Sequence, residues 1–223
     1  MRAGKTILTV FFAAALSLTA AGQIDDVGLW AGVKVTKKVT REFDISINPE
    51  YRFNHDVTTL DAFLTDVGLE YEIVRSVRVS LHYRFINSNR DNYYSKRHRL
   101  YADLAYRYKL KDFTFQVRGR IQQQYTDINS SEFGKYPVWT IRTKLGVRYD
   151  FGKKYTPYVS GELYYLLKDV TEADGIFTRN RYEAGFTYDF NRLHGINPFL
   201  LFQHNRITGF DELVYGIGYS VTL

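Results

Sequence analysis

Charged side chains that alternate with apolar ones carry most of the chemistry that this sequence could perform. In residues 113–125, apolar and aromatic side chains occupy one set of alternate positions, while threonine, glutamine and arginine occupy the other. Residues two apart share one face of a β-strand, so this segment predicts one apolar face and one charged face. The same division recurs along the chain. We expect the charged faces to line a common lumen, with candidate site residues Arg78, His82, Arg84, Asp103, Arg107, Arg118, Arg120, Arg142, Lys144, Arg148, Glu162, Arg181 and Glu183.

Two interpretations of this charged face are open. Long charged side chains inside a narrow barrel must be packed and neutralised, so interlocking ion pairs could plug the lumen. Alternatively, the excess of arginine over carboxylates between residues 118 and 148 could line a narrow pore that prefers anions. Arginine suits both roles, because its planar guanidinium binds carboxylates and other oxyanions through two nitrogens.

A lipid-modifying hydrolase is the enzymatic alternative. Its candidate residues are His98 with Ser95, and His204 with Asn205. Neither pair supplies a nucleophile, a base and an orienting group together, and no GxSxG motif is present. We therefore predict no catalytic residue and no enzymatic activity. An exported soluble β-barrel that binds a ligand is a further alternative.

No metal site or cofactor is predicted. The chain has no cysteine, no HExxH motif and no acidic loop with EF-hand spacing, and it lacks a glycine-rich phosphate loop. Acidic residues interleave with the basic ones, which disfavours binding of nucleic acid.

The elements that must position these residues are β-strands. Strand-forming aromatic residues are abundant, with 19 Tyr and 16 Phe, and no segment keeps a helical period beyond about two turns. Alternation predicts an all-β fold. Eleven candidate strands lie at residues 27–36, 43–53, 63–73, 77–85, 99–110, 113–125, 140–151, 155–168, 181–190, 196–206 and 214–223.

The connections between these segments alternate between short turns and longer loops rich in Asn, Ser, Asp and Gly, such as 87–96 and 127–136. This alternation predicts one antiparallel up-and-down transmembrane β-barrel over residues 23–223. Bacterial barrels of a single chain have an even number of strands, with both termini in the periplasm. Eleven is odd, so we expect 10 to 12 strands. Either segment 27–36 does not span, which leaves ten, or a twelfth strand is present.

Aromatic residues near the strand ends indicate that the apolar face meets lipid. Tyr71, Tyr106, Tyr149 and Tyr188 each come just before a short turn, as in the aromatic girdles of membrane barrels. The final segment, 214–223, alternates to the last residue and resembles the C-terminal signal read by the barrel-insertion machinery. These features predict the outer membrane of a Gram-negative bacterium.

The N-terminus has the order of a secretory signal peptide, which we place at residues 1–22. Arg2 and Lys5 precede an apolar stretch, 7–16, and small residues follow at 20–22. Because the leader holds two of the 30 basic residues, the remaining 201 residues carry 28 Lys and Arg against 24 Asp and Glu. This excess is mild. A mean hydropathy of −0.31 excludes a bundle of membrane-spanning helices, each of which needs roughly 20 mostly apolar residues.

Several short motifs are spaced along the chain: Trp30, Arg52, Lys96-Arg97, 158–164 and 179–182. They resemble those of a family of small outer-membrane β-barrels, the domain of unknown function 2490. The resemblance spans nearly all of residues 27–223, and it implies a barrel in the outer membrane without implying an activity. Outer-membrane lipid and the barrel-insertion machinery are the expected partners, and the basic segment 90–99 could contact lipopolysaccharide phosphates.

Overall fold

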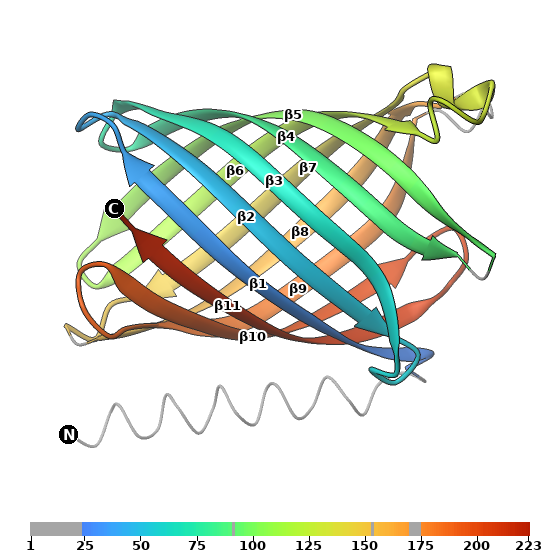
Figure 1. The fold of residues 1–223 in the computed structure, drawn as a ribbon. Helices are drawn as coiled ribbons and strands as arrows, with labels where there is room; N and C mark the ends of the chain where they lie inside the picture. The colour runs from blue at the N-terminus through green and yellow to red at the C-terminus, as the bar shows by residue number, and fades with distance from the viewer. Residues whose placement is uncertain (1–23, 91, 153, 170–174) are drawn as a thin grey trace.

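The computed structural model describes residues 24–90, 92–152, 154–169 and 175–223, so the proposed signal peptide lies outside the described residues. The described chain is almost entirely β-strand, with one short 3-10 helix, η2 (Phe133–Lys135) (Figure 1). Within those same ranges, no helix is long and apolar enough to cross a membrane. The strands are β1 (Asp26–Lys38), β2 (Phe43–Asn54), β3 (Thr59–Val74), β4 (Val77–Arg90), β5 (Tyr93–Leu110), β6 (Phe113–Thr126), β7 (Val138–Tyr149), β8 (Tyr155–Lys168), β9 (Ile176–Asp189), β10 (His194–Asn205) and β11 (Asp211–Thr222).

Each strand pairs with its sequence neighbours, and β1 closes the sheet against β11 to form a barrel (Figure 1). Ten of the eleven pairs are antiparallel, whereas the closing pair is parallel, from Asp26 opposite Glu212 to Thr36 opposite Thr222. The fold class is therefore confirmed. A closed sheet leaves no strand edge unpaired, which is the condition for placing a sheet in hydrocarbon.

The expectation of an even strand number was wrong, since the described residues form eleven strands. The first strand is a complete one, so neither the ten-strand nor the twelve-strand alternative holds. In an up-and-down barrel with an odd number of strands, the first and last strands run in the same direction. The pair of β1 with β11 that closes the barrel is therefore parallel. Leu223 bonds through its backbone to both Thr36 and Lys38 at the end of this pair. As a result, the chain enters the barrel at one rim and leaves it at the other.

The two rims differ in their connections. The short-turn rim, where β11 ends, carries the connections 39–42, 75–76, 111–112, 150–154 and 190–193. The loop rim carries 55–58, 91–92, 127–137, 169–175 and 206–210. Figure 1 shows the C-terminus at the first of these rims and the helix-bearing loop between β6 and β7 at the second.

One predicted long loop, 87–96, proved to be mostly strand. Strands β4 and β5 continue as a hairpin, pairing Asn87 with Lys96 and Arg90 with Tyr93. The prediction failed because it used alternation of apolar residues, and these positions are polar on both faces. A strand that extends past the apolar band into water still satisfies its backbone through the ladder.

The apolar face points outward and the charged face points into the lumen, as predicted. On β7, Ile141 is 37% exposed and Leu145 is 57% exposed, whereas Thr140 and Arg142 are 7% and 6% exposed. A water-soluble barrel would bury its apolar face inside. Exposed apolar side chains recur on every strand except β10. In soluble proteins, extended apolar surfaces mark sites of contact with protein or membrane.

Aromatic rings gather on the outer surface near the short-turn rim. The ring centroids of Phe113 and Tyr149 lie 4.8 Å apart, and those of Tyr149 and Phe151 lie 4.7 Å apart. Across the next turn, the rings of Tyr155 and Tyr188 lie 4.7 Å apart. These contacts form the aromatic girdle expected at a membrane interface.

Candidate functional site in the lumen

Side chains that point into the lumen are buried near the middle of the barrel, although an open tube would leave its inner face exposed. Ten of them come from eight strands, and each is at most 8% exposed. A lumen-facing side chain can be this buried only where side chains from other walls cover it. We call this set the plug; its members are Trp30, Asp66, Tyr101, Arg120, Gln122, Arg142, Glu162, Tyr164, Leu201 and Val214.

Contacts across the lumen hold the plug together. The Arg181 guanidinium, on β9, lies 5.2 Å from the Trp30 ring and 5.1 Å from the Tyr164 ring, so it joins β1 to β8. The Arg52 guanidinium also lies over the indole, 3.7 Å from its centroid. Arg142 lies 4.3 Å from the Tyr164 ring. Guanidinium groups that stack on aromatic faces in this way gain cation–π energy, which is larger where water is excluded.

An ionic ladder runs along one side of the plug. Arg120 binds both carboxylate oxygens of Asp103, at 2.6 and 2.7 Å, and Arg142 binds both oxygens of Glu162, at 3.1 and 2.8 Å. Arg118 lies between them, in an ion pair with Glu162 and 4.0 Å from Asp103. The ladder therefore contains three guanidiniums and two carboxylates, which leaves one uncompensated positive charge.

Asp66 organises a second cluster on β3, β4 and β5, beside the ladder, where the Arg120 guanidinium lies 3.7 Å from the Tyr101 ring. Its carboxylate accepts hydrogen bonds from Arg84 Nε at 2.8 Å and from the Tyr101 hydroxyl at 2.5 Å, and His82 Nδ1 lies 2.8 Å away. The His82 ring stacks on Tyr101, with centroids 4.7 Å apart. Gly68 makes this possible, because a Cβ there would lie 2.3 Å from the imidazole. The cluster matches one guanidinium with one carboxylate, so we assign it a structural role.

Nearer the short-turn rim lies a further network, in which three cations are matched by three carboxylates because Asp44 lies 4.0 Å from Arg78. Arg78 binds Glu70 at 3.1 Å and Glu72 at 3.2 Å. Arg107 reaches the same Glu72 at 3.5 Å, and Lys34 binds Glu70 at 2.9 Å.

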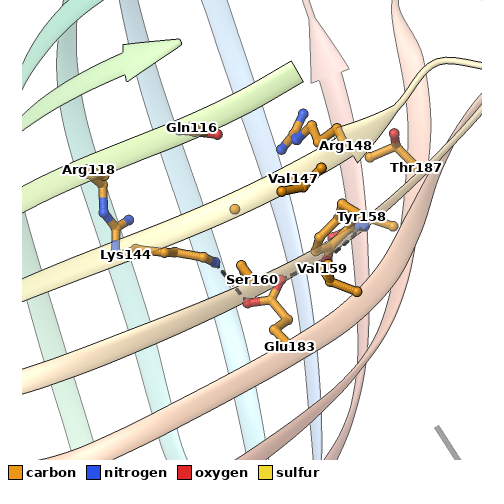
Figure 2. A pocket seen from close by; sticks show the side chains of 12 residues that line it. Gln116, Arg118, Lys144, Val147, Arg148, Tyr158, Val159, Ser160, Glu183 and Thr187 are labelled. Atoms are coloured by element: carbon orange, nitrogen blue, oxygen red, sulfur yellow. Dashed lines mark hydrogen bonds and ion pairs between the residues drawn. The ribbon is translucent and has the colours of Figure 1, made fainter. Parts of the chain in front are cut away.

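Below the plug, toward the short-turn rim, the lumen is open. Two adjoining cavities, of about 700 Å³ and about 240 Å³, share Gln116, Arg118 and Arg148 in their walls. We call them together the chamber. The larger cavity is lined as far as Thr114 and Asp150, which lie at the short-turn rim, so the chamber extends to that end of the barrel. The smaller cavity is shown in Figure 2, where Lys144 points toward Glu183.

The structure places all thirteen sequence-derived candidates on the lumen face and brings most of them into contact. Arg118, Arg120, Arg142, Asp103 and Glu162 form the ladder. The other eight fall into smaller groups. Arg78 and Arg107 share Glu72, and His82 and Arg84 share Asp66. Lys144 pairs with Glu183 at 3.0 Å, and Arg181 contacts the plug. Arg148 lies 5.7 Å from the Tyr158 ring and forms no ion pair with the residues that the structure describes.

Sequence reasoning missed the aromatic members of the plug. Tyr101 and Tyr164 occupy lumen-facing positions among charged residues. Alternation shows that such a position faces the lumen, but it does not distinguish a residue of the plug from any other lumen-facing residue. Asp66 lies among the polar positions of segment 63–73, but its role as an acceptor for three side chains depends on contacts between strands.

The hydrolase candidates do not converge. Ser95 donates to Asp127 at 2.9 Å, whereas His98, an odd number of residues away on the same strand, lies 2.7 Å from the outward-facing Tyr83 hydroxyl. His204 contacts Asp211 at 2.6 Å, and its neighbour Asn205 caps a backbone turn. Among the residues described, no group of three His, Cys, Asp or Glu side chains could hold a metal ion.

Comparison with protein families gives the chain its relatives. The model of the family DUF2490, described as a protein of unknown function, matches residues 27–214. The chain belongs to the DUF2490 family. This membership confirms the resemblance found in the sequence, and it attaches no activity to the lumen.

Several solved structures are similar to this DUF2490 barrel at low identity. LpxR from Salmonella typhimurium is 9% identical, with a TM-score of 0.49 over 81% of this chain and 83% of that chain. A KdgM porin in complex with disordered oligogalacturonate is 12% identical, with a TM-score of 0.47 over 81% and 91%. An anion-selective porin from Comamonas acidovorans is 13% identical, with a TM-score of 0.36 over 72% and 45%. The search among curated proteins found no match.

Proposed function

We propose that this DUF2490 protein is a barrel of the Gram-negative outer membrane whose lumen is closed by its own side chains. The exposed apolar outer face and the closed hydrogen-bonded sheet support placement in a bilayer. Membrane barrels carry short turns on the periplasmic side. We therefore orient the short-turn rim, and with it the chamber, toward the periplasm.

The burial of the plug is the observation that carries the closed state. Arg142 and Glu162 face the lumen and are each only 6% exposed, so neighbouring side chains fill the cross-section around them. Separating such a pair would leave buried charges without partners, which is strongly unfavourable. The plug is therefore held shut by its own ion pairs, and we assign the barrel a structural or ligand-holding role instead of diffusive transport. We propose no catalytic activity.

The contacts with the surroundings follow from this placement. We propose that the outer surface meets lipid and that the amphipathic strand β11 is the segment read by the barrel-insertion machinery. The end of the β4–β5 hairpin carries Arg90 and Lys96 at the loop rim, facing the cell exterior in this orientation. These cations are placed to contact lipopolysaccharide phosphates.

Planar-bilayer recording tests the closed state. We expect the refolded wild type to give no discrete conductance steps. The double variant Tyr101→Ala/Tyr164→Ala removes two buried rings from the plug and should give steps under the same conditions. As a matched control, Tyr71→Ala/Tyr182→Ala removes two rings that are each 49% exposed on the outer face, and it should remain silent.

Steps from the wild type would contradict the proposal. If the reversal potential in a salt gradient also showed anion preference, the alternative of a narrow anion-preferring pore would replace it. That alternative draws on the uncompensated arginine charge of the ladder.

A further inference from the structure

The wall of the chamber formed by β6, β7 and β8 differs from the rest of the lumen in its charge. The ladder contributes one uncompensated positive charge. Arg148 adds a second, because no carboxylate of the described chain lies within 4.0 Å of its guanidinium. On the neighbouring strands β4 and β5, by contrast, Arg78, Arg84 and Arg107 are each in ion pairs with carboxylates. The positive excess of the chamber is thus local.

Two residues of this wall carry buried hydrogen-bonding groups without partners. Arg118 Nε and Ser160 Oγ are both buried, and neither has a hydrogen-bond partner within the described chain. Both residues line the smaller cavity. Buried polar atoms are normally satisfied, so an unsatisfied donor pair at a cavity wall indicates a bound group or water. Lys144 lies beside them, with its ammonium held by Glu183 (Figure 2).

The space for a ligand comes from a missing side chain. Gly146 lies between Lys144 and Arg148 on the lumen face of β7, and a Cβ there would already touch Ser160 at 3.4 Å. A larger residue would fill part of the smaller cavity, whose volume is about 240 Å³. This volume suits a compact group and is smaller than the roughly 300–1,000 Å³ typical of pockets for drug-sized molecules.

We propose that the smaller cavity, which we call the recess, binds a small oxyanion. This oxyanion would be the phosphate or carboxylate group of a solute that enters from the short-turn rim. Arg118 and Arg148 would supply guanidinium donors, which bind oxyanions through paired N–H groups, and Ser160 would donate its hydroxyl. Gln116 offers an additional amide donor at the junction of the two cavities. Anion binding in the recess does not require the plug to be closed, so its test is independent of the test of the proposed function.

Cysteine labelling tests this inference, because the chain contains no cysteine of its own. Ser160→Cys places a thiol in the recess, and Ser80→Cys places one on the compensated wall of the same chamber. The measured quantity is the ratio of labelling rates by an anionic and a cationic methanethiosulfonate on the folded barrel in detergent. We expect this ratio to be about tenfold higher at position 160 than at position 80, a difference of about 1.4 kcal/mol.

Competition by anions completes the test. Inorganic phosphate or acetate should slow labelling by the anionic reagent at position 160 and leave the labelling rate at position 80 unchanged. Protection by phosphate alone assigns the site to phosphorylated solutes, and protection by acetate assigns it to carboxylates. Arg148→Ala, in the Ser160→Cys background, should abolish both the ratio and the protection. Arg41→Ala removes an equal charge from an exposed turn on the same rim and should preserve them. Equal ratios at both positions, no protection by either anion, or protection that survives Arg148→Ala would each overturn the proposal.

Discussion

Replacing Glu162 by alanine is expected to lower the free energy of unfolding by about 3–5 kcal/mol, as for other broken buried ion pairs. The substitution leaves Arg142, which is 6% exposed, without a carboxylate, and it leaves Arg118 with only Asp103 at 4.0 Å. The stranded charges, more than the lost attraction, account for the size of the effect. Urea titration of the barrel refolded in detergent, followed by circular dichroism, measures the change.

An exposed ion pair supplies the matched control for this prediction. Asp150 lies 3.8 Å from Lys109, and both side chains are about half exposed or more. Asp150→Ala should therefore cost no more than about 1 kcal/mol. Equal losses from Glu162→Ala and Asp150→Ala would show that water reaches the ladder, and the closed lumen would have to be abandoned.

Leu145→Arg is expected to cost about 2–4 kcal/mol when the barrel is folded in lipid vesicles. Leu145 is 57% exposed near the middle of β7. On a water-soluble protein, replacing an exposed leucine changes the free energy of unfolding by no more than about ±0.5 kcal/mol. On the lipid face near the bilayer midplane, the same replacement places a charged arginine in hydrocarbon, which is unfavourable. The same substitution therefore separates the two environments.

Val39→Arg is the control for the lipid-face substitution. Val39 is 52% exposed, but it lies in the turn between β1 and β2 and not in a strand. Its replacement should change the free energy of unfolding by no more than about 0.5 kcal/mol. A loss at position 145 as small as that at position 39 would mean that the apolar face meets water.

Alternation predicted the strands and their two faces because side-chain direction in a strand depends only on sequence parity. All eleven candidate segments are strands, including the first, for which the expected even strand number had left spanning open. Two features could not be predicted from parity. The parallel closure of β1 on β11 joins residues 186 apart, as between Asp25 and Asp211, and the β4–β5 hairpin extends through residues such as Asn87 and Ser88 that are polar on both faces.

The lumen composition was predictable, but its chemistry was not. Parity placed Arg118 and Glu162 on the inner face, yet their contact crosses from β6 to β8 over the intervening β7. Such contacts depend on strand tilt and register, which the sequence does not display locally. The same limit applies to the rings of Trp30 and Tyr164, which meet Arg181 only because the closed sheet brings β1, β8 and β9 around one lumen.

The sidedness of the barrel is tested most directly by spin labels at two adjacent positions on β7, Leu145→Cys and Lys144→Cys, in lipid bilayers. Oxygen concentrates in hydrocarbon and a nickel chelate stays in water, so collision rates with the two report the surroundings of each label. We expect the label at 145 to collide preferentially with oxygen and the label at 144 with the nickel chelate. The reverse order, or nickel-chelate preference at both positions, would contradict a barrel with lipid outside and charge within.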